Sequence, residues 1–204
     1  MRGPVIEVAL VVAVSFGCGG NTTEQAVSHP EEGQQQWRVV DLAALDHDQQ
    51  QQLERAAAAK DHLASTLMGA LTEELEVGGP AGAVDICRDM APMISEHTAE
   101  ETGVKIGRTS FRLRNPANQP PAWAADLVER HVEGPTTLVG PHGELGVLSP
   151  IRVAEPCLAC HGDPAAMDPA VRQAIADGYP HDEAVGFSDG ELRGWFWVEV
   201  PAES

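Results

Sequence analysis

The chain has 204 residues, of which 31 are acidic and 13 are basic, so its formal net charge is -18 at pH 7. Nucleic acids and anionic membrane surfaces are bound through clusters of lysine and arginine, so this charge argues against both as partners. It favours solubility and docking to basic proteins. The length is enough for about one domain that buries its core without disulfide bonds.

Residues 1–17 have the pattern of an export signal. The apolar run over residues 8–16 has the length of a signal-peptide core and is too short to span a bilayer. It is followed by a Gly-Cys pair that resembles the bacterial lipoprotein box and predicts lipid attachment at Cys18, although Ser15 and Glu7 depart from the usual box. An ordinary signal peptide and a retained membrane anchor are the alternatives. All three place the rest of the chain outside the cytoplasm, on the periplasmic side.

Residues 18–40 are polar and lack periodicity, which predicts a flexible tether ahead of a single domain over residues 41–204. Apolar residues then recur at helical spacing from Leu53 to Leu75, and Asp41 is a candidate cap for this helix. The Gly-Gly-Pro run over residues 78–80 ends it.

A second helical segment carries small and apolar residues on one face: Val84, Cys87, Ala91, Ile94 and Thr98. Pro92 must break or kink this helix, because proline lacks a backbone donor and clashes with the preceding turn. Gly103 ends the segment.

Shorter elements follow. Alternating apolar and polar residues predict strands over residues 104–114, 136–139, 144–153 and 192–200. Short helices are expected over residues 123–132 and 168–178, the second with a capping Asp168 followed by proline. Helices first and antiparallel strands later are typical of an α+β domain.

The chemistry-bearing motif is Cys157-Leu158-Ala159-Cys160-His161. Two thiols three positions apart can each add to one vinyl group of a haem, and the adjacent histidine then supplies an axial imidazole to the iron. One copy of the motif predicts one covalently bound haem c. Because this attachment takes place outside the cytoplasm, the export signal agrees with it independently.

Other uses of the cysteine pair are open. The two thiols could form a disulfide in an oxidising compartment. They could supply half of a zinc site, but only Cys87 is left in the mature chain to extend it. A thioredoxin-like pair normally follows a strand in a βαβ unit, and the sequence shows no such unit.

The residues alone leave the second iron ligand undecided. Cys87 lies on the apolar face of a predicted helix, where a lone cysteine is usually a small buried hydrophobic residue. Met90, Met93, Met167 and the other histidines are rivals, and methionine is common in electron-carrying cytochromes c, where it raises the potential.

Several stretches together resemble one known family. They are Ala-Val-Asp-Ile-Cys at 83–87, the Arg-Thr-Ser to Arg-Asn-Pro block within 106–116 with Asn118 and Trp123, the motif at 157–162, and Tyr-Pro-His-Asp-Glu-Ala-Val-Gly at 179–186 with Gly-Glu-Leu-Arg-Gly at 190–194. Over roughly residues 50–201 the chain resembles the Tll0287-like domain, a haem c-binding domain. The resemblance implies a PAS-like antiparallel sheet with N-terminal helices.

The resemblance also implies that a cysteine of the early helix, here Cys87, is the iron ligand opposite His161. A thiolate donates electron density and favours the ferric state, so we expect a reduction potential below that of a His/Met cytochrome. Such a site suits sensing or redox switching better than high-potential electron transfer.

Arg108, Arg112 and Arg114 have the same parity on the predicted strand, so their side chains would share a face. Guanidinium groups bind carboxylates well, and the haem propionates are candidate partners for them. The alternative is pairing with the abundant Asp and Glu of the chain itself. Tyr179 could line the same pocket, with core packing as its alternative role.

The sequence therefore predicts a single-haem domain that acts as a redox or ligand sensor or as a low-potential electron-transfer module. No output segment follows Ser204, so a separate, unknown redox or signalling partner protein is expected. The alternative is a haem enzyme of the peroxidase type, which needs an open iron position and is excluded by two axial ligands unless Cys87 dissociates. A lipoprotein with a structural disulfide is the third possibility.

Overall fold

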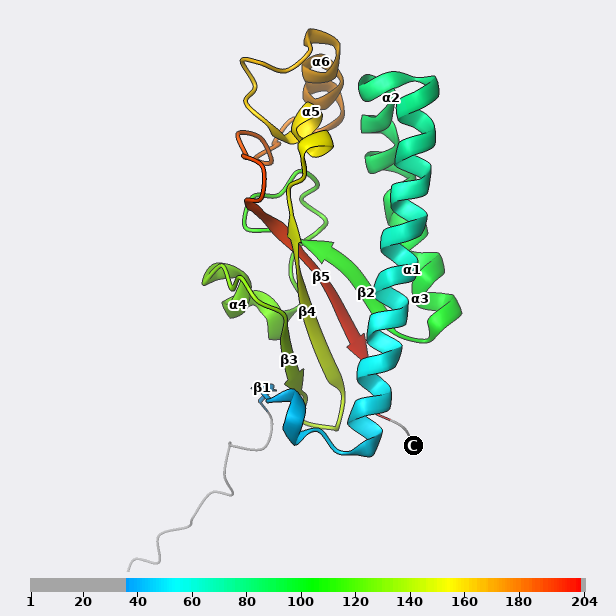
Figure 1. Cartoon of the computed structure of the whole chain (residues 1–204), viewed down its shortest axis with the longest axis vertical. Coiled ribbons are helices and arrows are strands. Elements are labelled where there is room, and N and C mark those ends of the chain that lie inside the picture. The colour runs from blue at the N-terminus through cyan, green and yellow to red at the C-terminus, as the bar shows by residue number, and fades with distance from the viewer. Residues whose placement is uncertain (1–35, 203–204) are drawn as a thin grey trace, which may run out of the picture. The chain divides into compact units, whose positions relative to one another are not determined.

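The structure, a computed structural model, describes residues 36–202 (Figure 1). The predicted export signal and Cys18, the predicted site of lipid attachment, lie outside the described residues. Within the described part, no helix is both long and apolar enough to cross a membrane.

The longest element is α1 (His47–Val77), which begins at a capping box. The backbone N–H of Gln49 donates to Asp46 at 2.9 Å, and the Gln49 side chain accepts from the Asp46 backbone at 3.1 Å. Asp41, predicted to cap this helix, instead caps the short 3₁₀ helix η2 (Leu42–Ala44) by accepting from Ala43. The predicted end is confirmed, because Gly78 is the C-cap.

The second helical segment is divided into three parts. It consists of α2 (Gly79–Asp85), a π-helical turn η3 (Ile86–Met90) and α3 (Ala91–Thr102). Pro92 lies in the first turn of α3, so the interruption expected from proline takes the form of a π turn just before it. Gly103 ends α3 in the left-handed conformation, with φ 65°.

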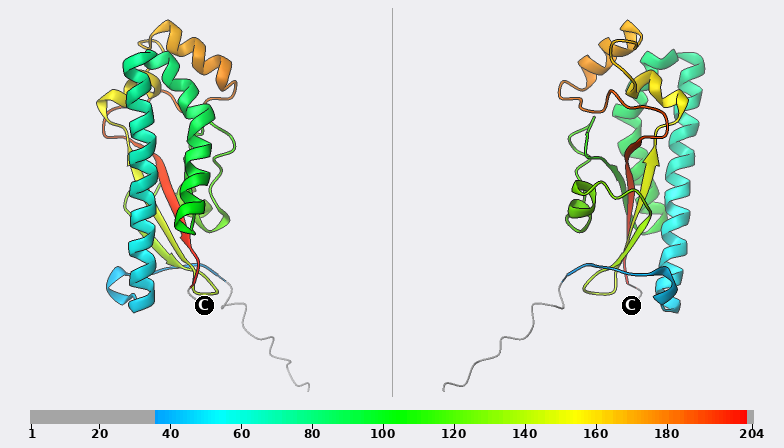
Figure 2. Two further views of the ribbon diagram at one scale, coloured as in Figure 1. Left: turned by 90° about the vertical axis from the view of Figure 1, so that its right-hand side faces the viewer. Right: turned by 60° about the vertical axis from the view of Figure 1, so that its left-hand side comes forward.

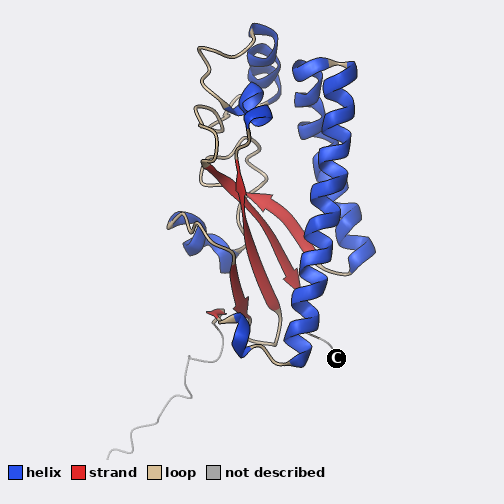
Figure 3. Ribbon diagram, in the orientation of Figure 1, coloured by secondary structure: helices blue, strands red, loops and turns tan. Residues whose placement is uncertain are grey.

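Five antiparallel strands form a single sheet in the order β1-β3-β4-β5-β2, which confirms the α+β fold (Figure 3). The strands are β1 (Arg38–Val39), β2 (Lys105–Thr109), β3 (Thr136–Val139), β4 (Leu145–Arg152) and β5 (Leu192–Val200). Residues 38 and 39, which the sequence assigns to the tether, pair with β3, and the neighbouring Trp37 stacks on Trp123 with ring centroids 5.3 Å apart. The ordered domain therefore includes residues before position 41.

Helices α1 and α3 lie side by side against one face of the sheet (Figure 2). A stripe on α1 packs on β4 and β5, where Leu63, Leu145 and Val200 are completely buried. The remaining helices are short: η4 (Ala122–Ala124), α4 (Ala125–Glu129), η5 (Glu155–Cys157), α5 (Leu158–His161) and α6 (Pro169–Gly178). Helix α6 begins at the predicted cap, since Asp168 accepts from the backbone of Ala170 at 2.7 Å.

A β-bulge interrupts the pairing of β4 with β5. Ile151 pairs with Gly194 and Arg152 pairs with Leu192, so Arg193 is left without a partner in the register. Bulges often redirect a side chain beside a functional site. Here the bulge turns Arg193 towards the cavity described below.

We expect Gly194→Ala to destabilise the domain by about 2 kcal/mol or more, because an alanine there would both strain the backbone and overlap with a neighbouring atom. Gly194 has φ 156°, and a Cβ there would lie 2.2 Å from the backbone oxygen of Thr109 on the adjacent strand. Urea unfolding followed by circular dichroism measures this cost. Gly134→Ala is the control, since no atom lies within 4 Å of a Cβ at that position. Equal stability of the two variants would contradict the prediction.

Candidate functional site

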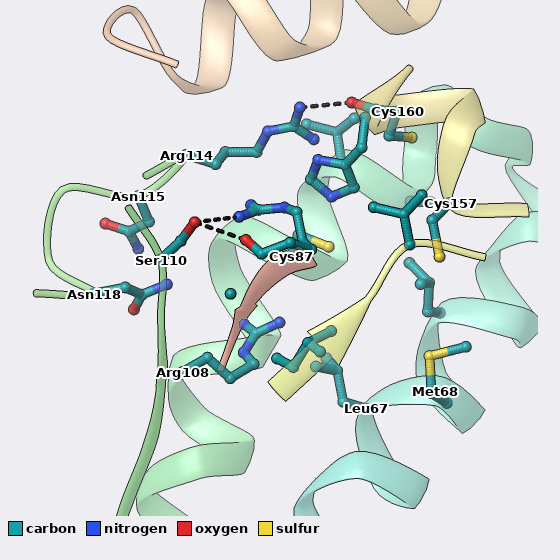
Figure 4. A pocket seen from close by; sticks show the side chains of 18 of the residues that line it. Leu67, Met68, Cys87, Arg108, Ser110, Arg114, Asn115, Asn118, Cys157 and Cys160 are labelled. Atoms are coloured by element: carbon teal, nitrogen blue, oxygen red, sulfur yellow. Dashed lines mark hydrogen bonds between the residues drawn. The ribbon is translucent and has the colours of Figure 1, made fainter. Parts of the chain in front are cut away.

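A cavity of about 230 Å³ lies between α1, the α2–η3 segment, the sheet and α5 (Figure 4). It is lined by Cys157 and Cys160, the predicted haem-attachment residues, and by His161 and Cys87, the predicted iron ligands. Apolar side chains form much of the remaining wall: Ala64, Leu67, Leu71, Leu75, Val84 and Phe196. An apolar cavity with a few convergent polar groups is the usual form of a cofactor site.

The two motif cysteines lie on successive helical turns, at the end of η5 and within α5. Their spacing places both thiols in the cavity wall. Cys87, Cys157 and Cys160 are free thiols, so the disulfide alternative is not formed in this structure. Burial raises the pKa of the Cys160 thiol, while the nearby Arg114 opposes that rise. Within residues 36–202, no three His, Cys, Asp or Glu side chains are grouped closely enough to bind a metal ion.

His161 has the orientation and protonation state of a ligand. Its Nδ1–H donates to the backbone oxygen of Ala184 at 2.7 Å, which leaves Nε2 as an acceptor. Burial lowers the pKa of His161 to about 3, and the positive charges of Arg114 and Arg193 add to this effect. The imidazole is therefore neutral near pH 7, as metal coordination requires.

Cys87 lies in the π turn, half-buried, on the wall contributed by the early helices. Of its methionine rivals, Met90 and Met93 are 42% and 67% exposed, and Met167 packs in a separate apolar cluster under α6. None of these three methionines lines the cavity, and neither does any described histidine except His161. Met68 on α1 does line it, a residue that the sequence did not single out.

Arg108 projects from β2 into the cavity. Burial lowers the pKa of its guanidinium, and the proximity of Cys87 and Tyr179 offsets part of that shift. Among the described residues it has neither an ion-pair partner nor a hydrogen-bond partner. Burying a positive charge without a counterion costs free energy. An anion bound beside Arg108 would offset that cost.

The expectation that Arg112 and Arg114 share a face with Arg108 is wrong, because β2 ends at Thr109. Arg112 lies outside the cavity, where it donates to the carbonyls of Glu183 and Val185 and stacks on Phe187. Arg114 does reach the cavity wall, but its guanidinium pairs with the buried carboxylate of Asp182 at 3.0 Å. Arg114 therefore pairs with an acidic residue of the chain itself rather than waiting for a haem propionate.

Tyr179 follows α6 and has both of the roles considered for it. It lines the cavity and also packs with Val84, Val171 and Ile175 in the cluster between α2 and α6. Burial raises the pKa of its hydroxyl to about 12, and the nearby Cys87 contributes to the rise. The phenol is therefore protonated at neutral pH.

A family model matches residues 31–201, a span that contains the whole sheet and every residue of the cavity. The chain belongs to the Tll0287-like family. One solved structure with this fold is that of the cyanobacterial heme-protein Tll0287, with a TM-score of 0.58 and 23% sequence identity. The similarity covers 76% of this chain and 97% of that one. No curated protein was found to be similar in sequence.

The cavity of this Tll0287-like chain also contains a residue that the sequence did not indicate. Arg193 donates to Ser110 Oγ at 2.9 Å and to the backbone oxygen of Arg112, while its buried Nε has no partner. Burial and the charge of Arg114 lower the pKa of Arg193 to about 10. The bulge in β5 directs it into the cavity, and the neighbouring Gly194, inside a run of strand-forming residues, is the local sequence signal typical of a bulge.

A second, more polar recess of about 150 Å³ adjoins the cavity on the Cys87 side. It shares Cys87, Arg108, Asn115 and Asn118 with the larger cavity and is closed by the start of α3. In Figure 4, Arg108, Asn115 and Asn118 lie away from Cys157 and Cys160. The polar end of the site is therefore opposite the two motif thiols.

Proposed function

We propose that this chain binds one haem covalently in the large cavity and functions as a redox or ligand sensor or a low-potential electron-transfer module. The observation that carries the proposal is the convergence of Cys157, Cys160, His161 and Cys87 on one apolar cavity. Membership of the Tll0287-like family supports it, because the solved relative is described as a heme-protein.

The residues fit such a group in kind and in position. Cys157 and Cys160 would form the two thioethers, and Nε2 of the neutral His161 would bind the iron. Cys87, on the opposite wall, would be the second axial ligand, since none of the methionines first considered reaches the cavity. Haem would supply one-electron chemistry at its iron, while the apolar wall excludes water and the thiolate of Cys87 favours the ferric state.

The polar end would bind the two propionates. Vinyl and propionate groups occupy opposite edges of the macrocycle, so thioethers at α5 direct the propionates away from it. Arg108, Asn115 and Asn118 lie at that far end (Figure 4). Arg108 is the best candidate for the contact because it has no other counterion among the described residues.

Ligand sensing is supported by the recess beside Cys87, which gives a small molecule a polar approach to the thiolate side of the haem. While both protein ligands are bound the iron would have no open position, so a small molecule would have to displace Cys87 to be sensed, and we propose a non-enzymatic role. The predicted lipid anchor at Cys18 would tether the domain on the periplasmic side, and the signal or electron would pass to a separate protein.

Intact mass spectrometry of protein matured with the cytochrome c assembly machinery tests this function. The parent chain should carry the mass of one haem, and a Cys157→Ala/Cys160→Ala variant should carry none. Cys87→Ala is the matched control, because it also removes a cavity thiol but should retain the covalent haem. Absence of the added mass from the parent chain would contradict the proposal.

A further inference from the structure

A groove of about 540 Å³ lies on the outer side of α5, behind the proposed haem-attachment motif. Leu158 and Ala159, the two residues between the motif cysteines, line this groove, whereas Cys157, Cys160 and also Ala159 line the cavity. A single helical turn therefore separates the two spaces. A protein seated in the groove would approach the cavity to within about one helix diameter, roughly 10 Å.

The groove has an apolar floor. Met167, Val171 and Phe187 form it and are 7%, 2% and 4% exposed. Pro80 and Ala166 extend it to the surface as exposed apolar residues. An apolar centre surrounded by charged or polar residues is the common anatomy of a protein interface.

The rim of the groove is acidic. Asp163, Asp168 and Asp189 line it and are exposed, and none of them forms an ion pair within the described part of the chain. Asp163 and Asp168 accept only backbone N–H groups, from Ala165 and Ala170. The one basic side chain of α6, Arg172, donates to the carbonyl of Pro164. The carboxylates therefore keep their negative charge for an external partner.

We propose that this groove docks a basic redox protein, whose lysine and arginine side chains surround an apolar contact patch. The inference rests on the proposed haem function. Charge complementarity selects this occupant, because the rim is acidic in a chain of net charge -18. A second copy of the chain would place one acidic rim against another, and like charges at an interface are repulsive.

Electron-transfer rates fall steeply with the distance between the two redox centres. A partner seated in the groove would be separated from the haem by little more than α5, so the electron would pass through this helix. In each encounter the bound haem would pass one electron to the partner, so that the haem would be oxidised by one electron and the metal centre of the partner reduced by one. No bond is made or broken. The two residues between the motif cysteines would lie between the redox centres.

Stopped-flow mixing of the ferrous holoprotein with a ferric basic cytochrome c tests the docking surface. The variant is Asp163→Asn/Asp168→Asn/Asp189→Asn, in which asparagine still accepts the backbone N–H groups at positions 163 and 168. We expect its second-order rate constant to fall on the order of ten-fold, with a weaker dependence on ionic strength.

The control variant is Asp48→Asn/Glu96→Gln/Glu100→Gln, which removes the same number of exposed carboxylates from the first turn of α1 and from α3, at positions that line neither the cavity nor the groove. It should keep more than half of the parent rate. Equal slowing of the two variants, at full haem content and unchanged potential, would overturn the docking surface alone. Failure of the parent chain to bind haem, measured first, would overturn the proposed function and the docking proposal together.

Discussion

Replacing Cys87 with alanine is expected to raise the reduction potential of the haem by on the order of 100 mV or more, because axial ligands tune haem potentials over about 0.8 V. The thiolate stabilises ferric iron, and its removal takes away that preference. The ferric absorption spectrum should change with the potential. A spectroelectrochemical titration of the two proteins measures both effects.

Met90→Ala is the matched control for Cys87. Both residues belong to the π turn η3, but Met90 is 42% exposed and does not line the cavity. Its replacement should leave the potential and the spectrum unchanged. If Cys87→Ala also leaves both unchanged, Cys87 is not an iron ligand, and Met68 becomes the next residue to replace.

Arg114→Leu is expected to cost about 3–5 kcal/mol of stability, the usual penalty for leaving one partner of a buried ion pair alone. Arg114 and Asp182 are 8% and 7% exposed, and Arg114 also donates to the carbonyls of Cys160 and Ala184 at 2.6 and 3.2 Å. The carbonyl of Ala184 in turn accepts from His161, so this ion pair fixes the segment that orients the axial ligand. Urea unfolding of the holoprotein measures the loss.

Arg130→Leu provides the comparison, because Arg130 and Asp126 form an exposed ion pair on α4, with side chains 60% and 76% exposed. Exposed pairs contribute about 1 kcal/mol or less. A loss for Arg114→Leu no larger than that for Arg130→Leu would show that the buried pair does not hold the ligand segment in place. Arg114→Leu should also broaden the ferric spectrum as His161 loses its fixed orientation, which a remote surface change would not do.

Much of the fold could be predicted from local patterns. The strands over 136–139 and 192–200 have the predicted bounds because β-branched and aromatic runs stand between turn residues. The sequence predicts too long a strand over residues 104–114, because polar and apolar residues go on alternating beyond Thr109, where β2 ends. Ser110 turns the chain there by donating to the Arg193 carbonyl and accepting from the backbone of Arg112. No periodicity marks the two residues of β1, which form a strand only by pairing with β3.

The site divides in the same way. Cys157, Cys160 and His161 form a local motif, so their shared place in the cavity could be predicted from spacing alone. Arg193 could not, because a bulge that shifts the register of two distant strands directs it inwards. The different environments of Arg108 and Arg114 likewise depend on the buried Asp182, which is 68 residues beyond Arg114 in the chain.

A pyridine haemochrome spectrum tests the central claim most directly. The protein would be matured with the cytochrome c assembly machinery, denatured and extracted with acidified solvent before the spectrum is recorded. Covalent attachment through Cys157 and Cys160 predicts that the colour stays with the protein and gives a c-type haemochrome. Haem that moves into the solvent, or protein that never acquires it, would contradict the account.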